Sequence, residues 1–307
     1  MNNKILVLAG PTAVGKTALS IELAKRLNGE IVSTDSMQIY KYMDIGSAKI
    51  TPSEMEGIKH HMIDVTTPDK PFSVVDFKTL AEPIIDDLLL ENKLPILTGG
   101  TGLYINALTC NMNFTDAPSD EEYRKELEEL AIAKGDGYIH EMLKEIDPIS
   151  YNSIHPNNRK RVIRALEVYK VTNKPFSSFN AGEDFYKSKY DVHYYVLDMN
   201  REKLYERINR RVDIMFENGL LEECIKLKEN GYNSSMQAMQ GIGYKEFRAY
   251  FEGAATLEEC IELVKKNTRH FVKRQYTWFN NQMPIEWYED KENAILEIDK
   301  WREKDEI

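Results

Sequence analysis

The chain has 307 residues, of which 42% are hydrophobic and 29% are charged. These proportions exclude a collagen-like, low-complexity or wholly disordered chain, and no apolar run approaches the roughly 18 residues of a membrane-spanning segment. The net charge of −10 by itself argues weakly against a nucleic-acid partner. The length suggests two domains, and the apolar stretch at the N-terminus is too short for a secretory signal, so we expect a cytoplasmic protein without membrane contact.

The charge is distributed unevenly along the chain. Residues 155–213 contain thirteen Lys and Arg against eight Asp and Glu. A local basic surface on an acidic protein is compatible with binding one polyanion, although a solvated helix face explains any single basic cluster equally well.

The opening of the chain predicts a strand, a loop and a helix. Residues 5–9 form a short apolar run, and residues 17–27 carry leucines at helical spacing. The same criteria predict further strands at 30–35, 94–98 and 194–199, and helices at 74–91, 202–218 and 257–280. Ser73 is a plausible cap for one of these helices, and Thr256 opens another with a capping box.

Short buried strands that alternate with helices indicate an α/β fold, in which a P-loop NTPase-like parallel sheet is flanked by helices on both faces. After about residue 113 the sequence changes to charged helices interrupted by prolines. We therefore expect an inserted all-helical domain at residues 114–189, and an α/β core built from residues 1–113 and 190–307.

One motif between the first strand and the first helix fits the pattern G-x-x-x-x-G-K-[ST]. It consists of Gly10, Pro11, Thr12, Ala13, Val14, Gly15, Lys16 and Thr17. In such a P-loop, backbone N–H groups surround phosphate oxygens, Lys16 supplies a positive charge, and the Thr17 hydroxyl can hold Mg²⁺. The motif predicts a binding site for a di- or triphosphate.

The motif does not identify the phosphate compound or its reaction. A nucleotide hydrolase normally has a second strand that ends in Asp, but the strand at 94–98 ends in Thr98 followed by glycines. Asp35 ends the neighbouring strand, at the edge of the sheet where open α/β folds bind ligands. It could accept a proton from a nucleophile or bind metal, and a helix or turn cap is the structural alternative.

Several basic side chains could accompany the P-loop. Arg207 and Arg211 share one face of a predicted helix that follows a strand of the same sheet, which would bring an arginine toward the phosphates, although a solvated face is the simpler reading. Lys265, Arg269 and Lys273 repeat this spacing before a run of aromatic residues. That pattern suits a nucleic acid with unstacked bases, but the aromatic residues could equally belong to the core.

Histidines and cysteines predict no metal site or disulfide framework. The adjacent His60 and His61 have no third ligand at a convincing spacing. Cys110, Cys224 and Cys260 lie far apart without a C-x-x-C pair, so we interpret them as buried thiols.

Six segments taken together resemble the tRNA dimethylallyltransferases, also called tRNA isopentenyltransferases. The segments are Gly10–Thr17, Asp35–Tyr40 continuing through Met43 to Lys49, Gly99–Tyr104, Arg161–Glu167, Gly241–Glu246 and Thr268–Trp278. No cysteine follows Cys260, so the chain resembles the bacterial form and not the eukaryotic relatives with a C-terminal zinc finger.

The resemblance implies transfer of a dimethylallyl group from dimethylallyl diphosphate to the exocyclic N6 amine of the adenosine 3′-adjacent to the anticodon, with Mg²⁺ as cofactor and diphosphate as product. Lys16, Thr17 with its Mg²⁺, and Arg211 would stabilise the leaving diphosphate. Asp35 would take the proton of the amine, and Thr101 would lie near the target base. The implied tRNA-binding residues are Asp35, Ser36, Met37, Gln38, Thr101, Arg124, Arg159, Lys160, Arg161, Arg164, Lys273 and Arg274.

Three other functions fit parts of the sequence. An adenylate isopentenyltransferase would prenylate a free nucleotide, but it would have no use for a long basic insertion or for the basic helix at 268–278. A P-loop kinase of a small metabolite, or a non-catalytic RNA-binding protein with a nucleotide switch, would use the P-loop differently. No obligate protein partner is evident from the sequence.

Overall fold

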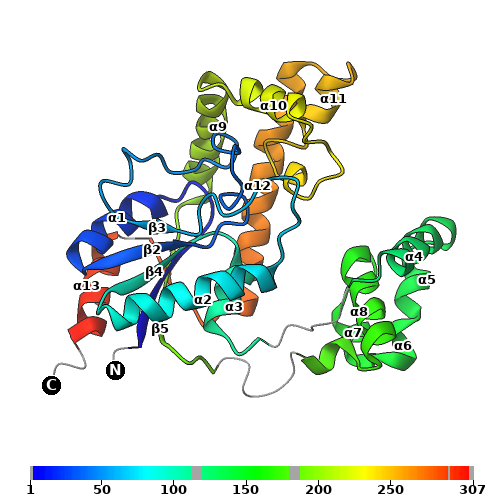
Figure 1. Ribbon diagram of the computed structural model, residues 1–307, viewed down its shortest axis with the longest axis horizontal. Helices are drawn as coiled ribbons and strands as arrows, with labels where there is room; N and C mark the ends of the chain where they lie inside the picture. Colours follow the sequence, from blue (N-terminus) through cyan, green and yellow to red (C-terminus); the bar gives the residue numbers. More distant parts are fainter. Residues whose placement is uncertain (1–2, 113–118, 180–186, 290, 304–307) are drawn as a thin grey trace. The chain divides into compact units, whose positions relative to one another are not determined.

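The computed structural model describes residues 3–112, 119–179, 187–289 and 291–303 (Figure 1). The chain divides into two compact units. Unit 1 comprises Met1–Thr109 and Ser188–Ile307, and unit 2 comprises Cys110–Lys187. The domain boundary that we expected between residues 113 and 114 lies outside the described residues.

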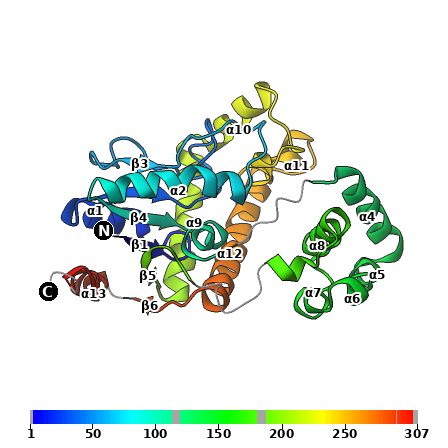
Figure 2. The same cartoon turned by 60° about the horizontal axis from the view of Figure 1, so that its bottom comes forward.

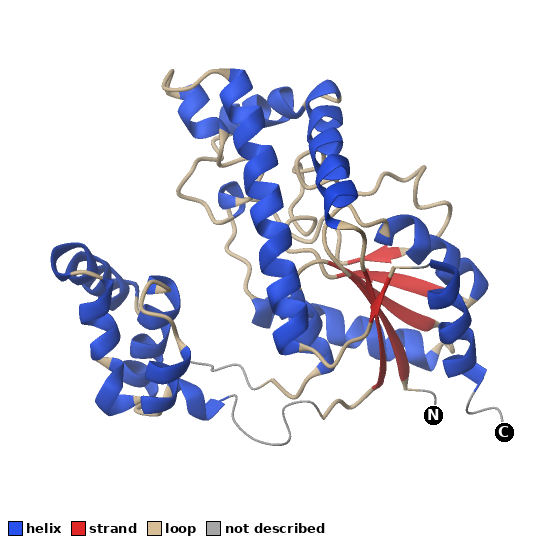
Figure 3. Ribbon diagram, turned by 180° about the vertical axis from the view of Figure 1, so that it is seen from behind, coloured by secondary structure: helices blue, strands red, loops and turns tan. Residues whose placement is uncertain are grey.

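Unit 1 is built on one parallel sheet (Figure 3). Its strand order is β3-β2-β4-β1-β5-β6. The strands are β1 (Lys4–Ala9), β2 (Gly29–Ser33), β3 (His60–His61), β4 (Leu94–Gly99), β5 (Asp191–Leu197) and β6 (Trp287–Tyr288). The predicted α/β fold with a parallel sheet flanked by helices is therefore confirmed. The two edge strands, β3 and β6, were not predicted, because two residues are too few to show a strand pattern.

Side chains of β1 alternate between two hydrophobic layers, as the period of a strand requires. Ile5 and Val7 pack into the layer that includes α2 and α3, whereas Leu6 and Leu8 pack into the layer of α1, α9 and α13. These helices are α1 (Lys16–Arg26), α2 (Val74–Leu90), α3 (Gly102–Thr109), α9 (Arg201–Glu217) and α13 (Lys291–Glu303). Figure 2 shows α2 and α13 on opposite sides of the sheet.

The remaining helices of unit 1 follow α9 in the chain. They are α10 (Leu220–Glu229), the one-turn 3₁₀ helix η2 (Ala238–Gln240), α11 (Phe247–Phe251) and the long α12 (Leu257–Gln282). Thr256 caps α12 through a capping box with Glu259, and Ser73 caps α2 in the same way with Asp76, so both predicted helix starts are confirmed. Along the described ranges, no helix is both long and apolar enough to cross a membrane.

The described part of unit 2 is helical. It contains α4 (Glu121–Lys134), α5 (Asp136–Glu141), α6 (Leu143–Ile146), α7 (Pro148–Ser153), α8 (Arg159–Thr172) and the 3₁₀ helix η1 (Phe176–Phe179). These helices enclose a core of their own, in which α4, α5 and α8 contribute Leu127, Ile139 and Leu166. Unit 2 thus has the separate hydrophobic core that defines a domain.

Candidate active site

Three functional segments meet at the edge of the sheet where β1, β2 and β4 end. Ala9 pairs with Gly99 and Ser33 pairs with Thr98, so these parallel strands finish in register. The backbone N–H of Thr34 donates to the Thr98 carbonyl at 2.9 Å, which continues the pairing beyond β2. The P-loop, the segment after β2 and the glycine turn after β4 therefore leave the sheet side by side.

The P-loop has the backbone geometry of an anion-binding loop. Gly10 has φ +143° and lies so close to β5 that a Cβ atom there would be 2.7 Å from the Leu197 carbonyl oxygen. Gly15 has φ +111° and precedes α1, whose N-terminus receives no side-chain cap. Because the N-cap residue Gly15 has no side chain to cap them, backbone N–H groups of the first turn of α1 can donate hydrogen bonds to a phosphate oxygen.

Lys16 is held inside this loop. Its Nζ donates to the carbonyl oxygens of Gly10 at 2.9 Å and Pro11 at 2.8 Å. Burial, followed by the positive charge of Arg211, lowers the pKa of Lys16 to about 7, and the negative charge of Asp35 partly opposes this shift. The negative charge of a bound phosphate group would favour the charged form of Lys16 and so offset the effects of burial and of Arg211 on its pKa.

Two arginines of α9 face the same site. The Nη2 atom of Arg207 lies 3.9 Å from the position that a Cβ of Gly15 would take. Burial lowers the pKa of Arg211, Asp35 opposes this shift, and Arg207 adds to it. We considered that Arg207 and Arg211 either face solvent or approach the phosphate site. In the structure both side chains lie at the cavity beside the P-loop.

One cavity of about 590 Å³ connects these groups. Its polar lining includes Lys16, Thr17, Asp35, Arg207 and Arg211. Its apolar lining consists of Ala13, Ala18, Ile31, Ile45, Ala48, Ile50, Ile214 and Met215. The cavity therefore offers both an anion-binding region and an apolar wall, which suits a ligand that has a phosphate group and a hydrocarbon group.

Asp35 has the structural role that we considered from the sequence, and it also lies at the cavity. Its Oδ1 accepts the backbone N–H of Met37 at 2.8 Å, so it caps a turn, and its carboxylate also lines the cavity. Thr101 is close to this turn, because its Oγ1 accepts the backbone N–H of Ser36 at 3.1 Å. The structure thus brings Thr101 to the turn of Asp35 and Ser36, although Ser36 and Thr101 are 65 residues apart in the sequence.

Met37 and Gln38 make their contacts within the protein. A Cβ atom on Gly241 would lie 2.3 Å from Met37 Cε, so this methionine packs directly against the backbone at Gly241. Gln38 accepts from Ser33 Oγ at 3.1 Å and donates to the Ala48 carbonyl at 3.3 Å. Gln38 also lines the cavity.

Helix α12 supports the P-loop through a residue that the sequence did not single out. Gln275 is buried, and its amide contacts both Thr12 and Gly100. Trp278 packs against Gly102, where a Cβ would lie 2.1 Å from its Cδ1. The only sequence signal for Gln275 was its place in the segment 268–278.

The basic residues of α12 divide into two groups. Lys265 pairs with Asp213 at 2.8 Å, and Arg269 donates to Asn209, so these two side chains join α12 to α9. Lys273 and Arg274 are exposed. Of the aromatic residues that follow, Phe279 is fully buried in the core.

In unit 2, three of the five predicted tRNA-binding residues have acidic partners. Arg124 and Arg164 both contact the fully buried carboxylate of Glu167, at 2.7 and 2.6 Å. Arg159 pairs with Asp136 at 2.6 Å and with Glu128 at 3.3 Å. Lys160 and Arg161 are exposed.

The histidines and cysteines have structural positions. His61 contacts Glu30 at 2.7 Å, and Cys110, Cys224 and Cys260 are buried. Within the described residues, no group of three or more His, Cys, Asp or Glu could hold a metal ion.

A P-loop at the edge of a parallel sheet, with arginines and a carboxylate around one cavity, is an arrangement typical of α/β enzymes with phosphorylated substrates. The family model for IPP transferase matches residues 38–282. The chain therefore belongs to the IPP transferase family, which confirms the resemblance seen in its motifs and the expected prenyltransferase activity.

Solved structures agree with this assignment. A tRNA isopentenylpyrophosphate transferase from Bacillus halodurans is 46% identical over 98% of this chain and 95% of its own, with a TM-score of 0.72. A tRNA delta(2)-isopentenylpyrophosphate transferase from Staphylococcus epidermidis is 43% identical over 99% of both chains, with a TM-score of 0.72. A eukaryotic dimethylallyltransferase acting on tRNA is 33% identical over 91% of this chain and 70% of its own, with a TM-score of 0.74.

Proposed function

We propose that this protein transfers the dimethylallyl group of dimethylallyl diphosphate to the N6 amine of the adenosine 3′-adjacent to the anticodon in tRNA. The observation that carries this proposal is the single cavity that combines the P-loop and two arginines with an apolar wall. A prenyl diphosphate has the matching halves, an anionic group and a short hydrocarbon chain. A cytoplasmic location belongs to the same proposal, because tRNA is used there.

The leaving group would be bound by the cationic part of the cavity. As the amine nitrogen bonds to the first carbon of the donor, the bond between that carbon and the diphosphate oxygen breaks. Negative charge then accumulates on the diphosphate, where Lys16, Arg207 and Arg211 can stabilise it. These side chains are in place before the reaction, so little reorganisation is required.

Asp35 is the residue best placed to receive the proton that the amine releases. Its carboxylate lines the cavity, and the turn that it caps holds it in position. A carboxylate within hydrogen-bond reach of the amine can act as general base as the new C–N bond forms. Thr101, beside Ser36, would contact the nucleotide that carries this amine.

Mg²⁺ fits this site as an ion shared with the substrate. Thr17 lines the cavity and offers its hydroxyl, whereas the described residues contain no complete set of protein ligands. Mg²⁺ commonly binds through few protein groups together with phosphate oxygens and water. When bound, it would neutralise part of the charge of the diphosphate.

The tRNA would contact exposed basic residues in both units. In unit 1 these are Lys273 and Arg274 of α12, and in unit 2 they are Lys160 and Arg161 at the start of α8. Arg124, Arg159 and Arg164 remain proposed contacts, but each of them would approach the tRNA while also holding an acidic partner.

The molecule that receives the dimethylallyl group distinguishes tRNA prenylation from prenylation of a free nucleotide and from a kinase reaction. Purified protein with carbon-labelled dimethylallyl diphosphate and Mg²⁺ should label an unmodified tRNA, but not a matched tRNA whose adenosine beside the anticodon is replaced by guanosine. Equal labelling of both tRNAs would contradict the proposed target. Label on AMP alone would identify an adenylate prenyltransferase, and phosphate transfer from ATP would identify a kinase.

A further inference from the structure

We propose that Glu223 and Tyr244 are positioning residues that fix one wall of the cavity and thereby determine which prenyl chain it accepts. The wall is the segment 44–50, called here the donor loop. This inference rests on the proposed function, because it assumes that the cavity binds a prenyl diphosphate.

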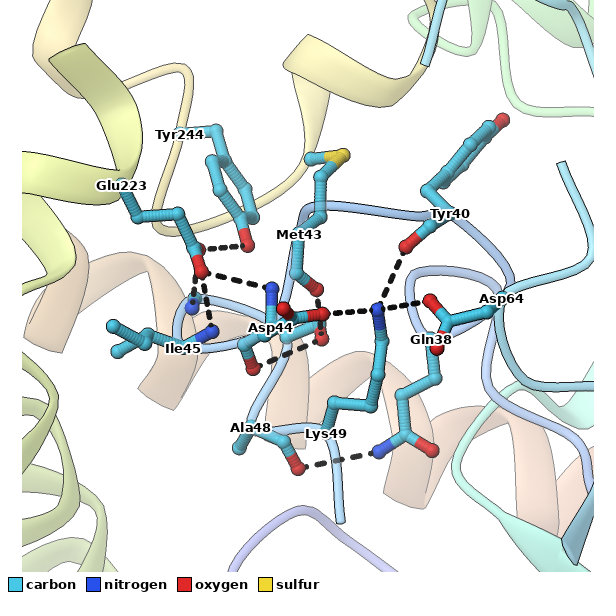
Figure 4. Close-up of polar contacts among 12 residues, drawn as sticks. Gln38, Tyr40, Met43, Asp44, Ile45, Ala48, Lys49, Asp64, Glu223 and Tyr244 are labelled. Atoms are coloured by element: carbon cyan, nitrogen blue, oxygen red, sulfur yellow. Dashed lines mark hydrogen bonds and ion pairs between the residues drawn. The ribbon is translucent and has the colours of Figure 1, made fainter. Parts of the chain in front are cut away.

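Glu223 of α10 binds the backbone of the donor loop at three successive residues (Figure 4). Its Oε2 accepts the N–H groups of Asp44 at 2.9 Å and Ile45 at 2.8 Å. Its Oε1 accepts the N–H of Gly46 at 3.1 Å. Successive N–H groups around one anion form a concave nest, and hydrogen bonds to a carboxylate are stronger than those between neutral groups.

Tyr244 completes this arrangement. Its hydroxyl donates to Glu223 Oε1 at 2.7 Å, and its side chain is buried. The ring also packs on the donor loop, since a Cβ atom on Gly46 would lie 2.5 Å from Tyr244 Cζ. Burial and then the charge of Glu223 raise the pKa of Tyr244 well above its usual range, so the hydroxyl stays protonated and continues to donate.

The other end of the donor loop is held by Lys49. The Lys49 side chain is 6% exposed, and its Nζ donates to the Tyr40 carbonyl at 2.8 Å and to Asp64 Oδ1 at 2.7 Å. It also pairs with Asp44, which connects the two ends of the loop (Figure 4). The loop therefore has one defined position between its two attachments.

That position sets the part of the apolar lining of the cavity that the donor loop contributes. Ile45, Ala48 and Ile50 of the donor loop line the cavity, and the N–H of Ile45 is one of the groups that Glu223 binds. Without the carboxylate, three backbone N–H groups would lose their acceptor, and the loop would move to reach water. A displaced wall would contact a dimethylallyl chain poorly and admit a longer one.

Loss of the Glu223 carboxylate should not affect the binding of the diphosphate group. In the part of the chain that the structure describes, the side-chain hydrogen bonds of Glu223 and Tyr244 do not involve the P-loop, Arg207 or Arg211. Inorganic diphosphate, which has no hydrocarbon chain, therefore serves as a probe for the binding of that group alone.

The test compares Glu223→Ala with Glu222→Ala, an exposed neighbour on the same helix. We expect Glu223→Ala to raise KM for dimethylallyl diphosphate about tenfold, while the Kd of inorganic diphosphate changes less than about twofold. The ratio of kcat/KM for geranyl diphosphate to that for dimethylallyl diphosphate should rise. Glu222→Ala should match the wild type in all three measurements.

Tyr244→Phe provides a second, milder variant that removes one hydrogen bond and keeps the ring. It should change KM and the chain-length ratio in the same direction by a smaller factor, and it decides the question if Glu223→Ala does not fold. An unchanged KM, or an equal weakening of inorganic diphosphate and donor, would overturn the inference. Failure of the wild type to prenylate tRNA would instead refute the proposed function.

Discussion

Gln275 binds Thr12 across 263 positions of the chain: its side-chain Oε1 accepts the backbone N–H of Thr12 at 3.0 Å. The Nε2 of the same amide donates to the Gly100 carbonyl at 3.0 Å. One buried side chain of α12 thus joins the P-loop to the glycine turn after β4. There is no room for a larger residue at Gly100, where a Cβ would lie 2.2 Å from this Nε2.

Replacing Gln275 by Leu should destabilise the protein and loosen the P-loop. The change leaves a backbone donor and a backbone acceptor without their partner, at a cost of about 1 to 3 kcal/mol for each buried group. We expect a lower midpoint of urea unfolding and a higher Kd for inorganic diphosphate. Thr277→Ala, at an exposed position of the same helix, is the control and should change neither value.

The substitution Asp35→Asn should slow prenyl transfer while the protein remains folded. The Asn carbonyl can still accept the Met37 N–H and preserve the turn, but an amide cannot take a proton from the adenine amine. We expect the single-turnover rate of prenyl transfer to fall by about 10² to 10⁴, with tRNA affinity nearly unchanged. A proportional loss of rate and affinity would mean that Asp35 has only a structural role.

Diphosphate binding should depend on pH through Lys16. Its pKa is lowered from 10.5 to about 7 in the ligand-free protein, so the amine carries its charge below pH 7 and loses it above. Because a bound anion favours the charged form, binding above about pH 7 should take up a proton, and affinity should fall as the pH rises.

Calorimetry in buffers of different ionisation enthalpy measures this proton uptake. Lys16→Ala provides the reference, since protonation of diphosphate itself is common to both proteins. The wild type should take up more protons than the variant at pH 8. Identical uptake would show that Lys16 does not change its protonation state when the ligand binds, which would contradict this prediction.

Arg161→Ala should weaken tRNA binding at every salt concentration and reduce the slope of log K against log salt by about 1. Arg161 is exposed at the start of α8. Arg159→Ala is an informative comparison, because that guanidinium already pairs with Asp136 and Glu128 and should release fewer counterions on binding. An unaltered salt slope in Arg161→Ala would remove this residue from the contact surface.

The sequence predicted the parts of the fold that depend on local patterns. The P-loop motif and its flanking residues predicted the first strand, the loop and the first helix. Asp35 ends a predicted strand, and we expected its carboxylate beside the P-loop because parallel strands end at the same edge of a sheet. Thr101 followed from the family resemblance. These residues lie together in the structure because β1, β2 and β4 are neighbours.

Contacts between segments that are far apart in the chain could not be predicted, because they produce no local pattern in the sequence. Glu223 binds backbone groups about 178 positions earlier, and any acidic residue on a half-exposed helix would look the same in the sequence. The family resemblance implied that Arg124 and Arg164 bind tRNA, but the sequence could not reveal that both contact the buried carboxylate of Glu167. Their charges satisfy this carboxylate, whose burial without a partner would be costly.

A dimethylallyl diphosphate that carries one label in its carbon chain and another in its phosphorus tests the central claim most directly. After reaction with unmodified tRNA, the account predicts that all transferred carbon label is bound to the RNA and that an equal amount of phosphorus label appears as free diphosphate. Phosphorus label in the RNA, or diphosphate release without RNA-bound carbon, would contradict it.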